Sequence, residues 1–521
     1  MKVLFISLAR RRGFTGYGVR MLSACLRKAN HQTGIVFVKN DRGDELQESV
    51  FDYISKVAEE YPVIGFSLMT DNFYDAMQIS QYLRRKSPEK LLVWGGTHPT
   101  VCPEESLAHC DIVCIGEGEE TIVGLVKAIE SGQDWRQISG LAFIENGIFR
   151  KSEKQELVID LDSLPFQDYS CEDHYVVSNE LSEKVSPHNL NHHLFVGDGY
   201  ETLATRGCPF GCTYCINNLW NKMYPLQKVI RKRSIDNVIE ELVAVRRKLP
   251  FIKTVYMLDD AFFMYSIDEI RQFSKQYREK IGCALMVTGI TPSTLRKDKL
   301  EYLIEAGLNE IRMGIQSGSD TIRKSYKRTH SEKIILKASG IFNYFVKKKM
   351  LKVVNYDIIL DNPWETEDEA IETLIFLSKL PAPFGLNQYS LTFYPGTEIF
   401  DRAIKDGLIN SPGKDFYRST NFFTFKKSYT NNLVYLVHFF AINQPFFISI
   451  NEKMMRLLTN KTYRSLGVSF LFYNALRFIR QVHKVFKPKG YYEVAAAAQL
   501  NYGFFSARKY FDRVRQWRQL L

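Results

Sequence analysis

Three cysteines packed into eight residues constrain this 521-residue chain more than any other feature. Cys208, Cys212 and Cys215 have the spacing C-x3-C-x2-C and directly follow a strand-like segment, residues 202–205. A [4Fe-4S] cluster normally takes four protein thiolates, so a set of three leaves one iron open to a small molecule. A structural zinc site would want a fourth Cys or His, and no C-x2-C or H-x3-H partner follows. The spacing therefore predicts an iron–sulfur cluster on a loop after a strand.

Composition predicts a globular protein of several domains in a reducing compartment. Hydrophobic residues make up 45% of the chain and charged residues 24%, and the length suggests about three domains. The first apolar run, residues 3–8, is too short for the core of a signal peptide and predicts a strand instead. The nine cysteines show no paired spacing, which fits thiols that are kept reduced. We therefore expect a cytoplasmic protein.

The first 130 or so residues alternate apolar runs with helical patterns, which predicts a doubly wound (flavodoxin-like) α/β domain with a parallel sheet. Such a domain binds its ligand at the carboxyl ends of its strands, where glycines let a bulky ligand approach the backbone. Strands are expected at residues 3–8, 34–38, 63–68, 91–94 and 112–115, and helices at 19–28, 46–60, 73–86 and 119–131. The carboxyl ends of these strands form the expected binding rim. Its expected binding residues are Ser67, Gly95, Gly96, Thr97 and Glu117.

A segment of about 60 residues follows, for which the sequence indicates no chemistry. A hairpin is expected near residues 141–150, and irregular structure after it. His188, His192 and His193 could bind a metal, but a polar loop with scattered histidines is the preferred interpretation.

From residue 202 to 394 the alternation of strands and helices restarts with a longer period, in six β/α units. Six units are too few to close an eight-stranded barrel, so an open, partial (β/α)6 barrel is expected, with its active residues at the strand C-termini. The expected strands are residues 202–206, 254–258, 284–289, 310–315, 353–360 and 388–394, with helical stretches that include 234–248, 267–280, 298–306 and 367–380.

Beyond residue 407 the sequence becomes helical, aromatic and basic. Residues 411–521 hold 18 Lys and Arg against 4 Asp and Glu, so the net charge of +11 comes from this part of the chain. Such a region is most often a solvent-exposed helical surface, but it could also bind an anionic substrate or a lipid surface. The apolar run 433–450 is interrupted by His438 and Pro445, which favours a buried or interfacial helix over a membrane span.

The cysteine loop, with Tyr214 just before its last cysteine, resembles the cluster loop of the radical S-adenosylmethionine (SAM) enzymes. That resemblance implies that the open iron chelates the amino and carboxylate groups of SAM. It also implies that Asp259 and Asp260, at the end of the second barrel strand, lie near the amino group of SAM, although a helix N-cap is an equal alternative. Gln316 and Ser317, after the fourth strand, match the segment that contacts the ribose or carboxylate of SAM.

The first domain resembles the cobalamin-binding domain attached to many radical SAM enzymes, on the strength of Ser67 and the pair Gly95-Gly96. The histidine of the usual D-x-H-x-x-G loop is missing, because no His precedes His31. This departure resembles a subgroup in which cobalt has no protein imidazole, and it leaves open a degenerate domain that binds nothing. The glycines of residues 13–18 do not match G-x-G-x-x-G, which argues against NAD.

These resemblances imply a cobalamin-dependent radical SAM methyltransferase, with a [4Fe-4S] cluster, SAM and cobalamin as cofactors. Reductive cleavage of SAM would drive methyl transfer to an unactivated carbon or phosphinate centre. Radical oxidation, cyclisation or rearrangement of a ring substrate is the first alternative, and a non-catalytic cofactor-binding sensor or assembly partner is the second. No catalytic side chain is assigned.

The expected partners are a small-molecule substrate and an external one-electron donor of the flavodoxin or ferredoxin type. No nucleic acid is expected, and peripheral membrane contact through the basic C-terminal region is a further expectation. The expected domains are residues 1–135 for cobalamin, 136–195 as a bridging segment, 196–408 as the partial barrel, and 409–521 as a helical basic region.

Overall fold

The computed structural model describes residues 1–9, 16–40, 44–194, 197–225, 227, 230–410, 412–413, 416–417, 425–443, 451–467, 469–471 and 474–475. The chain forms two compact units. The first unit comprises Met1–Thr288, Glu301–Leu308 and Phe393–Thr420. The second comprises Gly289–Leu300, Asn309–Thr392 and the chain from Asn421 onward.

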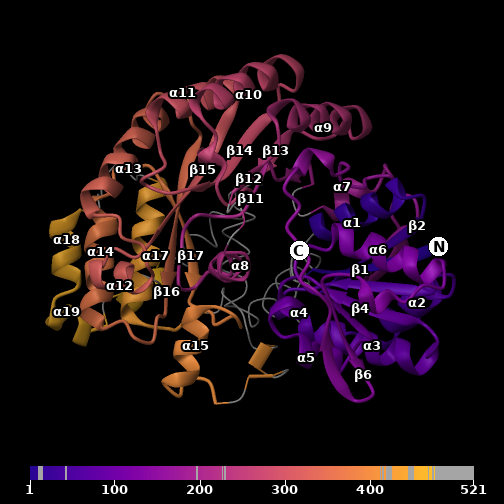
Figure 1. Cartoon of the computed structure of the whole chain (residues 1–521). Coiled ribbons are helices and arrows are strands. Elements are labelled where there is room, and N and C mark those ends of the chain that lie inside the picture. The colour runs from indigo at the N-terminus through magenta and orange to yellow at the C-terminus, as the bar shows by residue number, and fades with distance from the viewer. Residues whose placement is uncertain are drawn as a thin grey trace, which may run out of the picture. The chain divides into compact units, whose positions relative to one another are not determined.

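The N-terminal part of the first unit is built on a sheet with the strand order β7-β6-β5-β4-β3-β1-β2-β8-β9 among the described residues (Figure 1). Its central strands β5-β4-β3-β1-β2 are parallel and have the flavodoxin-like order, which confirms the predicted doubly wound domain. The central strands are β1 Lys2–Ala9, β2 Gln32–Lys39, β3 Val63–Ser67, β4 Leu91–Gly95 and β5 Ile112–Cys114.

Helices cover both faces of this sheet, as its apolar composition requires. Val3 to Ile6 of β1 are almost completely buried, the pattern of a parallel strand that is packed on both sides. In Figure 1, α1 and α6 lie on one side of β1 and β4, and α2 and α3 lie on the other. The helices are α1 Tyr17–Lys28, α2 Glu48–Ala58, α3 Phe73–Lys86, the short α4 Thr97–Val101 and α5 Pro103–Leu107, and α6 Glu119–Glu130.

The segment after this domain is more ordered than the sequence predicted. The hairpin is confirmed as β6 Leu141–Glu145 and β7 Ile148–Lys151, and β6 pairs antiparallel with β5. The expectation of irregular structure after it was wrong, because β8 His174–Ser178 pairs parallel with β2 and β9 Leu181–Lys184 pairs with β8. Without β8, the backbone N–H and C=O groups at the edge of β2 would have no strand partner. A short strand can pair with them even when its own apolar pattern is weak.

The histidines of this segment do not gather on a loop. His193 lies on the helical turn α7 Leu190–His193 and is buried, with its Nε2 2.9 Å from Oε1 of Glu183. This contact belongs to the packing of α7 against β9 and supports the preference for a structural role over a metal site.

A second, six-stranded sheet follows in chain order, as β10-β13-β14-β15-β16-β17 within the described residues. The strand pairings within β10-β13-β14 and within β15-β16-β17 are parallel, as a partial β/α barrel requires. The strands are β10 Gly199–Thr202, β13 Thr254–Met257, β14 Ala284–Ile290, β15 Leu308–Gln316, β16 Val353–Leu360 and β17 Gly385–Ser390. The helices between them are α8 Asn217–Met223, α9 Ile235–Lys248, α10 Ile267–Lys280, α11 Lys297–Ala306, α12 Asp320–Ser325, α13 Glu332–Lys347 and α14 Glu367–Lys379.

Two of the predicted barrel strands needed correction. The strand expected at 202–206 ends at Thr202, and β11 Thr205–Arg206 instead pairs antiparallel with β12 Arg231–Lys232. The strand expected at 388–394 begins and ends earlier, because its partner β16 ends at Leu360, which is opposite Ser390. Beyond that register position no backbone of β16 remains for pairing.

The C-terminal part that the structure describes is helical, as predicted, with α15 Glu398–Lys405, α17 Tyr429–Asn443, α18 Glu452–Leu458 and α19 Lys461–Ser465. The apolar run forms the buried helix α17, although its residues 444–450 lie outside the described residues. His438 of α17 accepts a hydrogen bond from the backbone N–H of Leu386 at 2.9 Å and so satisfies part of β17. Among the described helices, none has the length and apolar character needed to cross a membrane.

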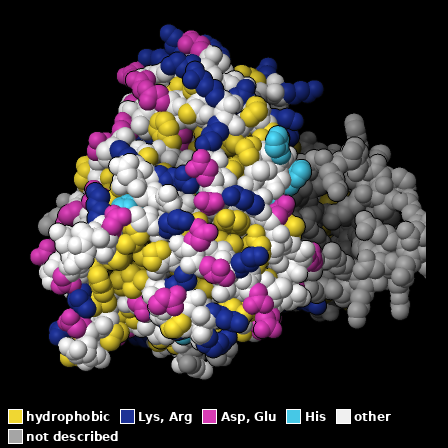
Figure 2. Space-filling model, turned by 90° about the vertical axis from the view of Figure 1, so that its right-hand side faces the viewer, with side chains coloured by type: hydrophobic (Ala, Val, Ile, Leu, Met, Phe, Trp, Pro, Cys, Tyr) yellow, Lys and Arg dark blue, Asp and Glu magenta, His cyan; other side chains and the backbone are white. Residues whose placement is uncertain are grey.

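The face of the molecule drawn in Figure 2 carries Lys and Arg interspersed with Asp and Glu, and small apolar patches between them. Such a mixed surface is ordinary for a globular protein.

Candidate cofactor site

The three cysteines of the motif lie on the loop between β11 and α8. None of the nine cysteines, which all lie among the described residues, forms a disulfide, and in the motif Cys212 is buried whereas Cys208 and Cys215 are half-buried. The backbone N–H of Cys215 donates to the carbonyl of Cys212 at 3.1 Å, which turns the loop back on itself. Burial, with smaller contributions from the charges of Asp260, Cys212 and Cys208, raises the pKa of Cys215 to about 12. Three cysteines on one short loop fit the donor set of a cluster with three protein ligands.

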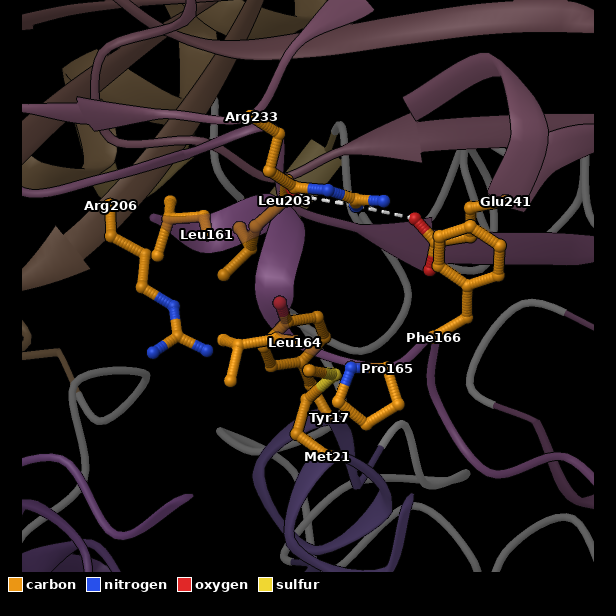
Figure 3. A pocket seen from close by; sticks show the side chains of 10 residues that line it. All are labelled: Tyr17, Met21, Leu161, Leu164, Pro165, Phe166, Leu203, Arg206, Arg233 and Glu241. Carbon is orange, nitrogen blue, oxygen red and sulfur yellow. Dashed lines mark hydrogen bonds and ion pairs between the residues drawn. The ribbon is translucent and has the colours of Figure 1, made fainter. Parts of the chain in front are cut away.

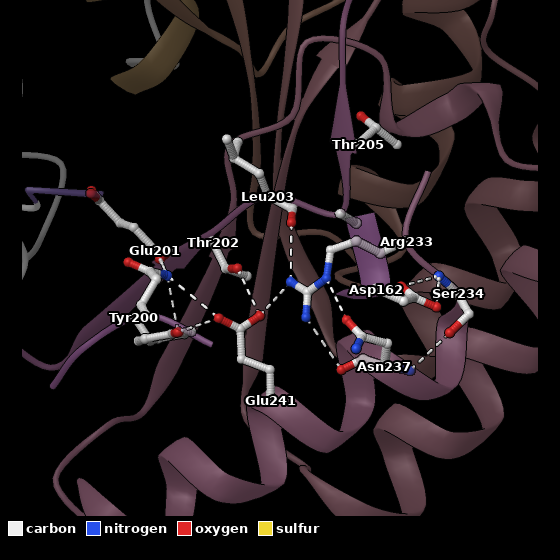
Figure 4. A network of polar contacts seen from close by, with 12 residues as sticks. Asp162, Tyr200, Glu201, Thr202, Leu203, Thr205, Arg233, Ser234, Asn237 and Glu241 are labelled. Atoms are coloured by element: carbon white, nitrogen blue, oxygen red, sulfur yellow. Dashed lines mark hydrogen bonds and ion pairs between the residues drawn. The ribbon is translucent and has the colours of Figure 1, made fainter. Parts of the chain in front are cut away.

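A buried polar network fixes the strand that leads into this loop (Figure 4). Glu241 of α9 accepts hydrogen bonds from Tyr200 Oη at 2.6 Å and Thr202 Oγ1 at 3.0 Å, both on β10. Arg233 forms an ion pair with Glu241 at 2.5 Å and donates to the carbonyl of Leu203 at 3.2 Å. The end of β10 and the residue after it are therefore held by α9 and Arg233, which anchors the approach to the cysteines.

Glu117, which the sequence predicted as a cofactor contact, is engaged by two arginines next to the cysteine loop. Its Oε1 accepts from Arg206 Nη1 at 3.1 Å and Arg231 Nη2 at 2.8 Å, and its Oε2 accepts from Arg231 Nη1 at 2.7 Å. Burial opposes ionisation, but these contacts lower the pKa of Glu117 overall. Its neighbour Glu119 accepts from Arg206 Nη2 at 2.6 Å. These contacts favour a structural role for Glu117, as a tie between the flavodoxin-like domain and the cysteine loop.

The two aspartates after β13 occupy different environments. Asp259 is buried, and its Oδ1 accepts from the N–H of Ala204 at 2.9 Å and from Thr205 Oγ1 at 2.7 Å. Its Oδ2 has no hydrogen-bond partner among the described residues. Burial raises the pKa of Asp259 to about 7.

Asp260, in contrast, is exposed and contributes to the raised pKa of Cys215. Although the residue as a whole is exposed to solvent, the protein surrounds its carboxyl group, and this burial raises the pKa of Asp260, while a hydrogen bond with Asn217 opposes the shift. Asp259 thus anchors the segment before the cysteines, whereas Asp260 lies close enough to them to influence the pKa of Cys215.

Several polar residues that the sequence did not single out support the loop. Asn221 of α8 donates to the carbonyl of Cys208 at 3.0 Å. Glu398 of α15 accepts from Asn218 at 2.8 Å and from Lys222 at 2.8 Å. Because Glu398 lies 180 residues from Asn218 in the chain, only the fold reveals this support. Tyr214 lies half-buried between the cysteines.

The predicted cobalamin rim gathers at the carboxyl ends of β3 and β4. Ser67 and Gly95 are partners in the sheet register, and the N–H of Leu68 donates to the carbonyl of Gly95 at 2.9 Å. Gly96 has a φ of +100°, and a Cβ there would lie 2.6 Å from the carbonyl oxygen of Leu68. Ser67, Gly95, Gly96 and Thr97 are all half-buried, so the rim is accessible. This accessible cradle of small residues fits a bulky cofactor, and residues 10–15, which follow β1, lie outside the described residues.

In the second unit, the residues predicted to contact SAM are tightly held. Gln316 is buried at the end of β15 with a φ of +72°, an uncommon conformation that often accompanies functional sites. Ser317 Oγ lies 2.9 Å from Thr373 Oγ1 of α14 and accepts from the N–H of Ser319 at 3.0 Å. The hydroxyl of Ser317 thus has partners within the protein, which leaves Gln316 as the better candidate for a ligand contact.

Another polar group in the second unit lies on one face of β15, β16 and β17. Arg312 donates to Asp357 Oδ1 at 3.1 Å and to Tyr389 Oη at 2.6 Å, and Asn387 donates to Asp357 Oδ1 at 2.7 Å. Tyr356, which directly precedes Asp357 on β16, is fully buried, and β16 packs against α13. Side chains alternate along a strand, so the Arg312 group faces away from that helix layer. In a partial barrel this is the inner face.

Two cavities lie near the cysteine loop within the first unit. The one shown in Figure 3, which includes Tyr17, Arg206 and Glu241, has a volume of about 20 Å³ and could hold no more than a water. A second, of about 130 Å³, has walls from the cysteine loop, α8 and the Glu117 tie. Its lining includes Glu117, Arg206, Gly207, Asn217, Trp220 and Tyr224.

The chain is thus an α/β protein in which a flavodoxin-like domain precedes a partial β/α barrel. A loop that carries the three cysteines follows the first strand of this barrel. Family models agree with both parts: the B12 binding domain matches residues 13–126, and the radical SAM superfamily matches residues 202–376. The chain belongs to the radical SAM enzymes that carry a cobalamin-binding domain. Its cofactors are accordingly a [4Fe-4S] cluster, SAM and cobalamin.

Several known proteins are similar to this chain. An uncharacterised methyltransferase of Pyrococcus horikoshii is 26% identical over 78% of this chain and 84% of its own. The bacteriochlorophyllide d C-8(2)-methyltransferase of Chlorobaculum tepidum is 23% identical over 67% and 70%. The anaerobic magnesium-protoporphyrin IX monomethyl ester cyclase of Cereibacter sphaeroides is 26% identical over 52% and 44%.

Among solved structures, the radical SAM methyltransferase TsrM of Kitasatospora setae, with cobalamin and a [4Fe-4S] cluster bound, has a TM-score of 0.61. It is 16% identical, and the match covers 79% of each chain. The likeness confirms the fold.

Proposed function

We propose that this chain transfers a methyl group from SAM, by way of cobalamin, to an unactivated carbon or phosphinate centre of a small molecule. The observation that carries the proposal is the pair of contacts that Glu117 makes with Arg206 and Arg231, which join the cobalamin-binding domain to the loop of three cysteines. A chain that holds the two cofactor-binding elements by buried ion pairs is built to use both cofactors in one reaction.

The cluster supplies one electron to bound SAM and cobalamin carries the methyl group, so the cofactors perform the difficult chemistry. The protein binds and orients them. Cys208, Cys212 and Cys215 would hold the cluster and leave one iron for SAM. Asp260 would pair with the ammonium group of SAM by a charge-assisted hydrogen bond, and Gln316 would contact its ribose or carboxylate. Ser67, Gly95, Gly96 and Thr97 would line the cobalamin site.

The inner face of the barrel would bind the methyl acceptor. Arg312, Asp357, Asn387 and Tyr389 offer donors and acceptors that already hydrogen-bond one another at 2.6–3.1 Å. An apolar acceptor would cover Arg312 and Asp357, which are partly exposed, and would remove their remaining contacts with water, which is costly in a closed site. We therefore favour an acceptor with polar substituents near the methylated centre.

In this proposal the chain has four parts, which are residues 1–135, 136–195, 196–408 and 409–521. The residues matched by the two family models fall within the first and third of these. An oxygen-sensitive cluster suits the cytoplasm and an external one-electron donor of the flavodoxin or ferredoxin type. The basic residues beyond 411 would support peripheral contact with an anionic membrane.

Product analysis tests the function. The protein is reconstituted without oxygen with iron, sulfide and cobalamin, reduced, and incubated with SAM carrying a deuterated methyl group and with candidate acceptors. Methyl transfer predicts a product that carries the deuterated methyl. An acceptor that is oxidised or cyclised without gaining the label would instead favour the cyclase alternative. Failure to cleave SAM at all would favour a non-catalytic sensor.

Matched variants keep that assay interpretable. Cys212→Ala removes a proposed cluster ligand, and Cys110→Ala removes another buried thiol outside the motif. The proposal requires that the first variant lose SAM cleavage and that the second retain it.

A further inference from the structure

A second group of metal-ligating side chains lies after β4, apart from the cysteine motif. His98 of α4, Cys102 between α4 and α5, and Glu105 of α5 each offer one ligand atom, and these three atoms lie within 4.8 Å of one another. The Nε2 atom of His98 is 3.6 Å from Oε2 of Glu105. The three residues come from one short stretch of the first unit, so their convergence depends only on the local turn between two short helices.

The ring of His98 is fully buried, and its two nitrogens have different surroundings. Its Nδ1 lies 3.2 Å from Thr70 Oγ1, whereas its Nε2 has no hydrogen-bond partner among the described residues. A proton on Nδ1 satisfies the threonine contact and leaves the lone pair on Nε2, on the side of Cys102 and Glu105. Metal-binding histidines typically show this arrangement, with one nitrogen held by a hydrogen bond and the other turned to the ion.

We propose that His98, Cys102 and Glu105 bind a zinc ion. One nitrogen, one sulfur and one carboxylate oxygen form a donor set that zinc accepts, and the thiolate and carboxylate together balance its two positive charges. A tetrahedral zinc ion holds its ligand atoms roughly 3.5 Å apart, so small side-chain movements suffice. The fourth position is left for a water. Binding displaces the thiol proton of Cys102 to solvent, and zinc affinity should therefore fall as the pH is lowered.

Two further residues orient the ligands. Thr70 fixes the ring of His98, and Tyr417 Oη donates to Glu105 Oε2 at 3.1 Å. The ring of Tyr417 also packs on that of His98, with their centroids 5.0 Å apart. An ion here would fix the turn that follows Gly95-Gly96 and would connect it, through Glu105, to the segment that carries Tyr417. This role is independent of the methyl-transfer reaction.

The test measures zinc in the full-length protein whose iron–sulfur cluster has been reconstituted, so that the motif cysteines are occupied. Zinc per chain is determined by elemental mass spectrometry after gel filtration, affinity by competition with a chelator, and coordination by X-ray absorption at the zinc edge. Cys102→Ser and Glu105→Gln remove proposed ligands. Cys110→Ser and Glu104→Gln are their controls, since each changes a thiol or carboxylate nearby and outside the group.

One zinc per chain is expected, with a single Zn–S distance of about 2.3 Å and shorter bonds to nitrogen and oxygen. Cys102→Ser should lose the Zn–S signal and Glu105→Gln should lose affinity, whereas both controls should retain zinc. Thr70→Val should weaken zinc binding by about 10- to 100-fold without abolishing it. Wild-type protein that retains no zinc, zinc held equally by Cys102→Ser, or coordination by several sulfurs would overturn the proposal. Circular dichroism identifies any variant that does not fold. The zinc content and affinity of the folded variants then decide whether the three residues bind zinc.

Discussion

Arg206 donates from Nη2 to Glu119 Oε1 at 2.6 Å, and this ion pair joins the cysteine loop to the first turn of α6. Arg206 lies two residues before Cys208, and Glu119 lies at the N-terminus of a helix of the cobalamin-binding domain. Both side chains are nearly buried, with exposures of 14% and 9%. The position of the cysteine loop relative to that domain therefore depends on an ion pair that is largely shielded from water.

Breaking this pair should destabilise the protein. Arg206→Met leaves the carboxylates of Glu117 and Glu119 buried with one cation fewer, which costs about 3 to 5 kcal/mol. Urea unfolding measures the loss. Arg136→Met, which removes an exposed pair with Asp134, is the control and should change stability by less than about 1 kcal/mol. Similar losses in the two variants would mean that the buried tie contributes little.

The titration of Asp259 should appear in the pH dependence of stability. Burial raises its pKa from 3.8 to about 7, so between these values the folded state keeps a proton that the unfolded chain has lost. The free energy of unfolding should therefore decrease as the pH rises from about 4 to 7 and then level off, by at most about 4 kcal/mol. In Asp259→Asn this decrease should be absent, because the amide oxygen still accepts from Ala204 and Thr205 and does not titrate. Parallel pH profiles for the variant and the wild type would contradict the assignment.

Asp260 should contribute to SAM binding. Asp260→Asn removes a carboxylate next to Cys215, and loss of a charge-assisted hydrogen bond should raise the dissociation constant of SAM by about tenfold to a hundredfold. Equilibrium dialysis of the reconstituted protein measures this change. Asp268→Asn alters an exposed carboxylate further along the chain and should leave the constant as it is. If both variants bind SAM as the wild type does, Asp260 has no role in recognition.

Gly96 should tolerate no side chain. Its φ is +100°, and a Cβ there would lie 2.6 Å from the Leu68 carbonyl oxygen, so Gly96→Ala must shift the β3 loop and should cost more than about 2 kcal/mol. Cobalamin retention, read from its visible absorption, should fall with it. Gly132→Ala is the matched control, since that glycine also has a positive φ but would place its Cβ within 4 Å of no atom among the described residues. If both variants lose the same amount of stability, the effect at Gly96 comes from its backbone conformation alone and not from the contact with Leu68.

The sequence was sufficient for features whose signal is local. The cysteine spacing predicted a loop for an iron–sulfur cluster, and the apolar β/α alternation predicted both sheets. Contacts between distant residues could not be predicted in this way. Glu117 looked like a ligand contact because it follows a strand in a Gly-rich loop, yet its partners Arg206 and Arg231 lie 89 and 114 residues further along the chain.

The errors in the strands have the same origin. β8 is short and is stabilised by the free edge of β2, so its formation depends on the rest of the sheet. Likewise, the end of β17 is set by the length of β16 and not by its own apolar pattern. Neither property is contained in the segment itself.

An iron that the three cysteines leave open for SAM is central to the proposed reaction, and electron paramagnetic resonance tests it most directly. The reconstituted, reduced protein is measured before and after SAM is added, and again with SAM labelled with oxygen-17 in its carboxylate. If the iron is open, about one equivalent of SAM changes the cluster spectrum, and the labelled carboxylate broadens it or shows hyperfine coupling. A spectrum that SAM leaves unchanged, with no coupling to the label, would contradict an open iron.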